Sequence, residues 1–268
     1  MKGKLGVIAG SGELPRLIVK EAKKLGYQCA VAAIKGQAEA SLEQEKVDFQ
    51  WFTVRDIQSL ISFFKTSGIR QTVLAGKVDH RIIYSLKESS LESFPFLAGK
   101  ENRGPSALLE AVIDYLGQEG IEVKNPMFLL PSLVCKEGIL TKTKHSPSIE
   151  KDIAFGWKLA KNMADLDIGQ TVVVKNRAVV AVEAMDGTDE TIKRAGRLAG
   201  SGTVVVKVAR TRQDFRIDLP AVGLNTIRTM VEAESTSLCF EAEIMPFFQK
   251  EEAIKLADAH HISIVARK

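Results

Sequence analysis

The sequence of 268 residues has few of the side chains that most often carry metal or redox chemistry. It holds four His and three Cys, and the absence of CxxC, HxxxH and HExxH spacings argues against a Cys/His zinc site. The three cysteines, Cys29, Cys135 and Cys239, are scattered, as is typical of a reducing compartment. We therefore expect any catalysis to use carboxylates, hydroxyls, Lys and Arg, or a hard metal ion.

Aromatic residues and net charge are also low. Aromatics make up 6% of the chain, which leaves little to stack against the bases of single-stranded nucleic acid. The formal net charge of +4 is far from the dense basic stripe of a dedicated DNA-binding domain. It suits a small anionic ligand or an anionic membrane surface without requiring either. We expect no nucleic-acid partner.

Long apolar runs are missing as well. The longest uncharged stretch, residues 125–135, is too short to cross a bilayer and contains two prolines. Near the N-terminus, Glu13 interrupts the apolar run too early for a signal peptide. The expected location is the cytoplasm, and binding at the membrane surface stays open.

The hydrophobic pattern predicts an α/β fold with two domains. In the first half, predicted strands alternate with predicted helices, as in a parallel sheet. The strands are residues 5–9, 29–34, 49–54 and 72–75, and the helices are 13–25, 57–64 and 106–117. Residues 81–105 are predicted as a helix plus an irregular loop. We expect residues 1–135 to form a Rossmann-like domain with a parallel sheet.

The polar residues 136–148 are the predicted linker between the two domains. A helix is expected over 149–164, followed by a hairpin of strands 170–174 and 178–184 around Lys175-Asn176-Arg177. Further strands and helices alternate to the end of the chain. The prediction for residues 149–268 is an α/β domain with a mixed sheet.

A glycine-rich loop, Gly10-Ser11-Gly12, follows the first predicted strand. Glycines there let backbone N–H groups approach a phosphate at the start of a helix. A dinucleotide fingerprint has a third glycine where this chain has Pro15, and no acid follows Ile34-Lys35 to hold a ribose, so NAD and FAD are disfavoured. The loop is either a phosphate or nucleotide contact or a tight turn that packs helix on sheet.

Three carboxylates, Glu183, Asp186 and Asp189, recur at intervals of three where a strand gives way to a helix. Clustered carboxylates suit Mg²⁺, with phosphate oxygens completing its shell. The alternative is a capped helix, with Thr188 as the N-cap and Asp189 beside the positive end of the helix dipole.

The most unusual stretch is residues 207–223, a loop after a predicted strand. In open α/β folds, ligands bind at the carboxyl ends of strands. Arg can bind phosphate oxygens with two hydrogen bonds, and Asp can hold Mg²⁺ or orient a water molecule. The alternative is a surface loop joined by Arg–Asp pairs. Its charged residues are Lys207, Arg210, Arg212, Asp214, Arg216 and Asp218.

Through these motifs the sequence resembles the LpxI family of UDP-2,3-diacylglucosamine pyrophosphatases, which act in lipid A (lipopolysaccharide) biosynthesis. The resemblance covers nearly the whole chain. The matching segments are Leu5–Pro15, Leu74–Val78, Asp152–Trp157, Asp167–Val173, Ala181–Asp189, Val206–Val208 and Gln213–Gly223. The sequence departs from the family pattern at Asp79-His80-Arg81 and at Gly104-Pro105-Ser106.

The resemblance implies a hydrolase that uses Mg²⁺. Its substrate would be UDP-2,3-diacylglucosamine, a lipid-linked UDP-sugar, and its products 2,3-diacylglucosamine 1-phosphate (lipid X) and UMP. The family's key acid corresponds to Asp218, which the neighbouring arginines should keep ionised. The resemblance also implies that residues 149–268 are the catalytic domain and that the protein contacts the inner face of the inner membrane transiently. A homo-oligomer is compatible with this interpretation. The alternatives are another nucleotide-sugar hydrolase or transferase, and a non-catalytic regulator that binds UDP-sugar or lipid.

The predicted site residues fall into three groups. The catalytic group is Asp218, Asp214 and Glu183. The substrate-binding group is Gly10, Ser11, Gly12, Lys77, Thr188, Lys207, Arg210, Arg212 and Arg216. The metal-binding group is Asp218, Asp186 and Asp189.

Overall fold

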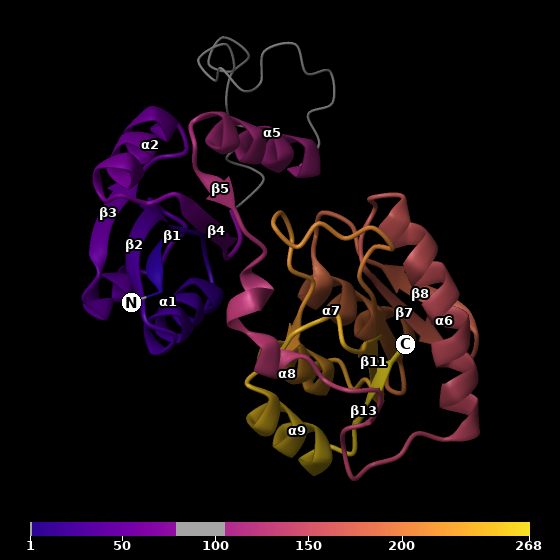
Figure 1. Ribbon diagram of the computed structural model, residues 1–268. Coiled ribbons are helices and arrows are strands. Elements are labelled where there is room, and N and C mark those ends of the chain that lie inside the picture. The colour runs from indigo at the N-terminus through magenta and orange to yellow at the C-terminus, as the bar shows by residue number, and fades with distance from the viewer. Residues whose placement is uncertain (1, 79–104) are drawn as a thin grey trace. The chain divides into compact units, whose positions relative to one another are not determined.

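The computed structural model describes residues 2–78 and 105–268 and divides the chain into two units, each with its own sheet (Figure 1). The first unit comprises Met1–Leu130 and the short segment Asp214–Asp218. The second comprises Pro131–Gln213 and Leu219–Lys268. The predicted helix and loop of 81–105 lie outside the described residues except for Pro105, and so do the sequence departures at 79–81 and Gly104.

The first unit contains a five-stranded sheet in the order β3-β2-β1-β4-β5, with every pair parallel. The parallel α/β prediction for this half is therefore confirmed. The order is that of the first five strands of doubly wound α/β folds. The strands are β1 (Gly3–Ala9), β2 (Tyr27–Ile34), β3 (Asp48–Phe52), β4 (Gln71–Ala75) and β5 (Glu122–Val123), and the helices are α1 (Leu14–Lys24), α2 (Ile57–Thr66) and α5 (Pro105–Gln118).

Apolar spacing explains how the helices of this unit pack. The α2 residues Leu60, Ile61 and Phe64 are buried, as their helical spacing predicts, and they join a core cluster with Phe52 and with α5. Asp56 stands at the N-cap of α2, yet its carboxylate accepts a hydrogen bond from the Thr53 amide at 2.7 Å rather than capping the helix. The helix is therefore held by its apolar face rather than by a side-chain cap.

The second unit contains a six-stranded mixed sheet in the order β6-β13-β11-β9-β7-β8. The three central strands β13, β11 and β9 are parallel, and β6 and β7 pair with them antiparallel. This confirms the predicted mixed sheet. The strands are β6 (Gly138–Ile139), β7 (Thr171–Lys175), β8 (Ala178–Val182), β9 (Val204–Lys207), β11 (Ser237–Glu241) and β13 (Ser263–Arg267), and a separate pair is β10 (Val222–Gly223) with β12 (Phe247–Phe248).

Helices cover both faces of this sheet. Alternate strand residues point to opposite faces. Helix α6 (Pro147–Asp165) packs on the face that carries Val206 and Cys239. The helices α7 (Thr188–Ala199), α8 (Leu224–Glu232) and α9 (Lys250–Ala259) pack on the other face, with Val205 and Leu238 (Figure 1). The second unit is thus a three-layer sandwich with two cores.

The predicted linker at 136–148 belongs to the second unit instead. Its residues Gly138 and Ile139 pair with β13, and the Leu140 amide donates to the Ile264 carbonyl at 2.8 Å. Ser146 then caps α6 by accepting a hydrogen bond from the Ile149 amide. The polar composition reflects a short edge strand and a helix start. By contacts the two units divide between Leu130 and Pro131. The predicted domain boundaries stay a prediction.

The predicted hairpin forms between β7 and β8, and a buried carboxylate holds its turn. Asn176 and Arg177 both have positive φ, 52° and 59°, as a type I′ turn requires. Their amides donate to the two carboxylate oxygens of Asp152, at 2.9 and 2.7 Å. Asp152 lies on α6 and is only 7% exposed, so it fastens the hairpin to the helix.

Replacing Asp152 with Ala should lower the free energy of unfolding by about 2 kcal/mol, because two hydrogen bonds to a carboxylate are lost. Urea denaturation measures this change. The control is Lys158→Ala, an exposed position on the same helix, which should change stability by less than about 0.5 kcal/mol. Equal denaturation midpoints for the two variants would contradict this role of Asp152.

Candidate functional site

In the first unit, the glycine-rich loop meets the loop after β4. The amides of Ser11 and Lys77 donate to each other's carbonyl oxygens, at 2.7 and 3.1 Å, and the Ser11 hydroxyl also donates to the Lys77 carbonyl at 2.9 Å. Strands β1 and β4 are neighbours in the sheet, and the strand order reverses between them. Ligands of open α/β sheets bind at this point. The fold thus brings Gly10–Gly12 and Lys77 together where a phosphate would bind.

Close backbone contact explains why one position of this loop is glycine, but it does not explain another. A Cβ on Gly10 would lie 2.4 Å from the Lys77 carbonyl oxygen. At Gly12, where φ is +90°, a Cβ would meet nothing within 4 Å. Helix α1 begins at Leu14, and the acidic residue Glu13 stands at its N-cap. Tight packing therefore explains Gly10, while Gly12 leaves open space before a helix start whose N-cap is itself acidic.

Replacing Gly10 with Ala should destabilise the protein by about 2 kcal/mol, because the added methyl group overlaps backbone that cannot move away freely. The matched control is Gly117→Ala in α5, where a Cβ meets nothing within 4 Å and Ala favours the helix by up to about 1 kcal/mol. Thermal unfolding should therefore shift in opposite directions. A Gly10→Ala variant as stable as the natural chain would refute the close contact.

The first unit also includes Asp214–Asp218, the segment that carries two predicted catalytic acids. Ile217 packs against the core cluster that α2 and α5 help to form. Arg216 donates to both carboxylate oxygens of Asp214, with Nη2 to Oδ2 at 2.7 Å and Nε to Oδ1 at 3.0 Å. The Asp218 amide donates to the Asp214 carbonyl at 3.3 Å, which places Asp218 one turn further on.

Charge pairing between Asp214 and Arg216 shifts the pKa of both side chains. The hydrogen bond from Arg216 lowers the pKa of Asp214, against the opposing effect of partial burial. The same hydrogen bond raises the pKa of Arg216, with smaller contributions from Asp114 and Glu110. Asp214 and Arg216 thus bind each other, as the Arg–Asp pairing alternative expects. Their predicted catalytic and substrate-binding roles stay predictions.

In the second unit, three predicted residues join one chain of hydrogen bonds. The Lys207 Nζ at the end of β9 donates to the Thr188 hydroxyl at 2.8 Å. That hydroxyl donates to Glu183 Oε1 at 2.8 Å, and the backbone amide of Gln170 donates to Glu183 Oε2 at 3.2 Å. Lys207 and Thr188 are each 8% exposed. The sheet therefore gathers a cation, a hydroxyl and a carboxylate at the carboxyl ends of β8 and β9.

Thr188 does not cap helix α7, so that part of the alternative was wrong, whereas Asp189 does lie in the first turn of the helix, as the other part expects. Gly187, at φ 80°, takes the N-cap position, and Thr188 is the first residue of the helix. No side chain caps this end. The Thr188 hydroxyl instead lies between Lys207 and Glu183. A buried ammonium group competes successfully for a hydroxyl that an exposed helix end would otherwise bind.

Two predicted metal ligands follow β8. Asp186 Oδ2 accepts from Arg194 Nη2 at 2.8 Å, and its Oδ1 accepts from the Ala184 amide at 3.0 Å. Partial burial acts to raise the pKa of Asp186, but these two donors outweigh it and lower the pKa. Asp189 is exposed in the first turn of α7. Asp186 therefore binds a backbone amide of its own loop and an arginine of the helix that follows.

A ready-made metal cage is absent from the part of the chain that the structure describes. There, no three His, Cys, Asp or Glu side chains lie close enough together to hold an ion. Mg²⁺ commonly binds through one or two carboxylates, with water and substrate phosphates as its other ligands. The set Asp218, Asp186 and Asp189 stays a prediction.

Two amide side chains link this polar chain to the next loop. Gln170 Nε2 donates to Gln213 Oε1 at 3.1 Å, and the Arg210 amide donates to the same oxygen at 3.2 Å. Arg210 also pairs with Asp167, and Arg212 is exposed. Sequence reasoning missed both glutamines because an uncharged amide carries no signal of its own. The available signal was their position in family motifs: Gln170 lies in Asp167–Val173, and Gln213 begins Gln213–Gly223.

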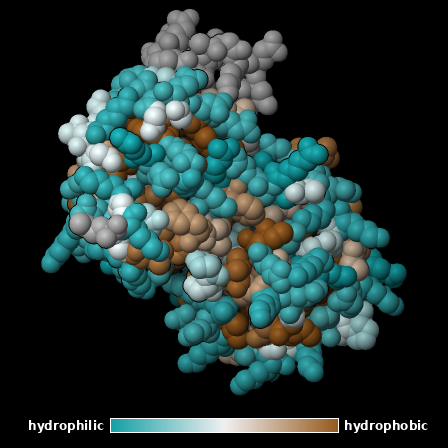
Figure 2. Space-filling view, in the orientation of Figure 1, coloured by the Kyte–Doolittle hydropathy of each residue, from teal (hydrophilic) through white to brown (hydrophobic). Residues whose placement is uncertain are grey.

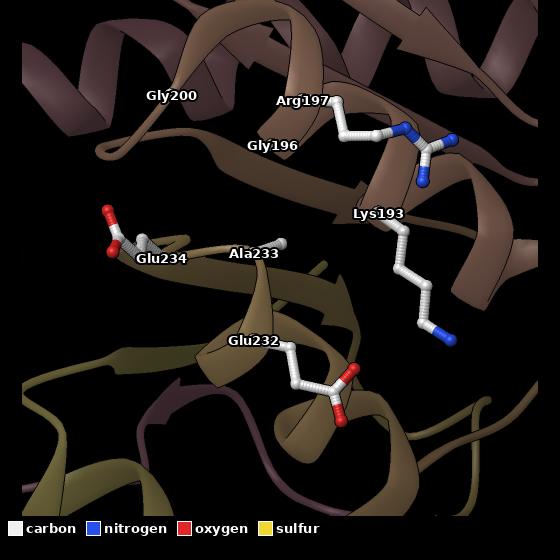
Figure 3. Close-up of a pocket in the computed structure, with 7 residues that line it drawn as sticks. All are labelled: Lys193, Gly196, Arg197, Gly200, Glu232, Ala233 and Glu234. Carbon is white, nitrogen blue, oxygen red and sulfur yellow. The ribbon is translucent and has the colours of Figure 1, made fainter.

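A surface pocket of the second unit lies away from these residues (Figure 3). It lies between the ends of α7 and α8, and its lining mixes charges of both signs. The lining residues are Lys193, Gly196, Arg197, Gly200, Glu232, Ala233 and Glu234. None of the predicted site residues lines it.

The described residues contain no helix that is both long and apolar enough to cross a bilayer. The face shown in Figure 2 is largely hydrophilic, with hydrophobic residues between the polar ones. Leu166 and Met185 are among the most exposed large hydrophobic residues, at 71% and 65%. The predicted membrane contact stays a prediction.

Solved structures give only weak likenesses. N5-carboxyaminoimidazole ribonucleotide synthetase from Thermotoga maritima is 17% identical, with a TM-score of 0.27 over 64% of this chain and 33% of its own. A GalE-like L-threonine dehydrogenase from Cupriavidus necator is 16% identical, with a TM-score of 0.29 over 57% of this chain and 49% of its own. Likenesses this low support no conclusion about fold or function.

Sequence comparison is far more specific. UDP-2,3-diacylglucosamine pyrophosphatase LpxI of Caulobacter vibrioides is 28% identical over 265 residues, which cover 95% of this chain and 94% of the relative. The model of the LpxI N-terminal domain matches residues 4–133, and that of the LpxI C-terminal domain matches residues 136–265. The chain therefore belongs to the LpxI family.

Proposed function

We propose that this protein hydrolyses the diphosphate of UDP-2,3-diacylglucosamine in lipid A biosynthesis, giving 2,3-diacylglucosamine 1-phosphate and UMP. One observation carries the proposal: the match to the Caulobacter vibrioides pyrophosphatase runs over 95% of this chain and 94% of the relative. A match of that extent includes both domains of the chain. Because the substrate is lipid-linked, the place of action would be the inner face of the membrane.

The buried Lys207 is the best candidate for binding the diphosphate. Lys207 lies at the carboxyl end of β9 and the residue is only 8% exposed, so an anion beside it would interact with its ammonium group across little water. The Thr188 hydroxyl accepts from the ammonium group and is itself oriented by its hydrogen bond to Glu183. A fixed positive charge costs no reorganisation when negative charge builds up on a phosphoryl oxygen. Arg210 and Arg212 would bind further oxygens of the diphosphate.

Asp218 is the proposed ligand of Mg²⁺ or acceptor for the attacking water. The ion would supply charge neutralisation to the diphosphate. In the reaction, the water oxygen forms a bond to one phosphorus, the bridging P–O bond breaks, and UMP and the sugar phosphate separate. Phosphoryl transfer of this kind needs alignment and charge stabilisation more than a covalent intermediate. Ser11, Gly12 and Lys77 would contact the uridine or a phosphate.

A substrate panel tests this function. Purified protein with Mg²⁺ is offered UDP-2,3-diacylglucosamine, the monoacylated UDP-sugar and UDP-N-acetylglucosamine, and UMP is measured. We expect release of UMP from the diacylated substrate at a rate at least tenfold above the others. Preference for the sugar without acyl chains would favour another nucleotide-sugar hydrolase. Binding of the diacylated substrate without UMP at any Mg²⁺ concentration would favour a regulator.

A further inference from the structure

The second unit contains a buried ion pair that the proposed chemistry does not use. Lys161 Nζ, on α6, lies 2.7 Å from both carboxylate oxygens of Glu241, the last residue of β11. Their side chains are 24% and 10% exposed. Removing two charges from water costs free energy that their mutual attraction often fails to recover. Stability alone is therefore a weak reason for this pair, and its further contacts indicate another role.

The pair holds both backbone polar groups of one residue. The Ala209 amide donates to Glu241 Oε2 at 2.9 Å, and the Ala209 carbonyl accepts from Lys161 Nζ at 3.0 Å. Ala209 is completely buried. It directly precedes Arg210 and follows Lys207 by two residues. Two charged side chains thus fix the backbone where the loop of predicted phosphate ligands begins.

The same helix fastens the next part of the loop. Asp165 accepts from the Thr211 amide and from the Thr211 hydroxyl, each at 2.7 Å. Lys161 and Asp165 are four residues apart, so they lie on one face of α6. Arg210 pairs with Asp167, just past the end of that helix. The loop is therefore tied to α6 at three successive residues, Ala209, Arg210 and Thr211.

We infer that Lys161 and Glu241 are positioning residues, which hold Ala209 so that Arg210 and the following residues meet the diphosphate in the right place. The inference rests on the proposed function. Neither side chain needs to contact substrate, because both act through the Ala209 backbone. A displacement of about 1 Å in a group that binds the reacting atoms can lower a rate by about 100-fold.

The test is the double variant Lys161→Met/Glu241→Leu in the full chain. Apolar replacement of a whole ion pair removes the cost of burying the charges, but it also leaves the buried Ala209 amide and carbonyl without these partners, so this variant should fold with a lowered unfolding midpoint. We expect kcat to fall by about 100-fold. Amide hydrogen exchange at residues 210–213 should become faster while β9 and β11 stay protected. The matched control is Val205→Ala, which weakens the core of the same unit and should leave kcat within twofold.

A folded double variant with natural kcat and unchanged exchange at 210–213 would overturn the inference. The single variant Lys161→Arg, which keeps the charge, should keep most of the activity that the double variant loses. If the pair were purely structural, the double variant would change only the unfolding midpoint. If the natural chain itself releases no UMP, the proposed function fails. In that case the exchange measurement still decides whether the ion pair fixes the loop.

Discussion

Replacing Asp218 with Asn should lower kcat by about 1000-fold and leave the unfolding midpoint nearly unchanged. Losses of this size follow when a group that stabilises phosphoryl-transfer charge is removed. The carboxylate is the acid that the family resemblance singles out. Asn has nearly the same shape as Asp but carries no charge, so it can neither bind Mg²⁺ comparably nor accept a proton from water. UMP release at saturating substrate measures the loss.

Two controls sharpen this prediction. Asp48→Asn changes an exposed carboxylate on β3, the outer strand of the first unit, and should keep natural activity. Asp214→Asn should lower kcat less than Asp218→Asn, because Asp214 is occupied by Arg216 through two hydrogen bonds to its oxygens. A folded Asp218→Asn variant with more than a tenth of the natural kcat would remove Asp218 from its proposed role.

Replacing Lys207 with Met should lower kcat/KM by about 100-fold. Met keeps an unbranched apolar side chain at this buried position but lacks the ammonium group. The diphosphate would then lose a desolvated positive charge, whose removal costs far more than the loss of an exposed one. Circular dichroism and thermal unfolding establish that the variant is folded before its rate is compared.

The matched control is Lys193→Met on α7, which removes an equal charge from a side chain that is 40% exposed and pairs with Glu190. Its kcat/KM should stay within twofold of the natural value, because water and salt screen an exposed charge. Equal losses in the two variants would mean that net charge alone matters. A folded Lys207→Met variant with unchanged kcat/KM would exclude Lys207 from substrate binding.

The sequence predicted those parts of the fold that depend on local periodicity. The apolar spacing of Leu60, Ile61 and Phe64 predicted α2 because it places all three on one helical face. The polar residues Lys175-Asn176-Arg177 between two apolar runs predicted the hairpin, and the turn indeed forms there. Both parallel and mixed sheets followed from the order in which strands and helices alternate.

Contacts between residues far apart in sequence were the parts that local patterns missed. Ile217 packs with a core cluster whose other members have numbers below 124, and no periodicity announces such a contact. The role of Thr188 depended on Lys207, which lies 19 positions later. Glu241 and Lys161 are 80 positions apart, and only the folded sheet brings them together. Single-sequence reasoning thus located charged motifs without showing which side chains bind one another.

The most direct test of the proposed function is a phosphorus-31 NMR spectrum of the full chain acting on UDP-2,3-diacylglucosamine in detergent micelles with Mg²⁺. The two diphosphate signals should decrease together, while UMP and the sugar 1-phosphate appear in equal amounts. Chelation of Mg²⁺ should stop the reaction. Diphosphate signals that stay unchanged with folded protein and excess Mg²⁺ would contradict the assignment of this chain as a UDP-2,3-diacylglucosamine pyrophosphatase.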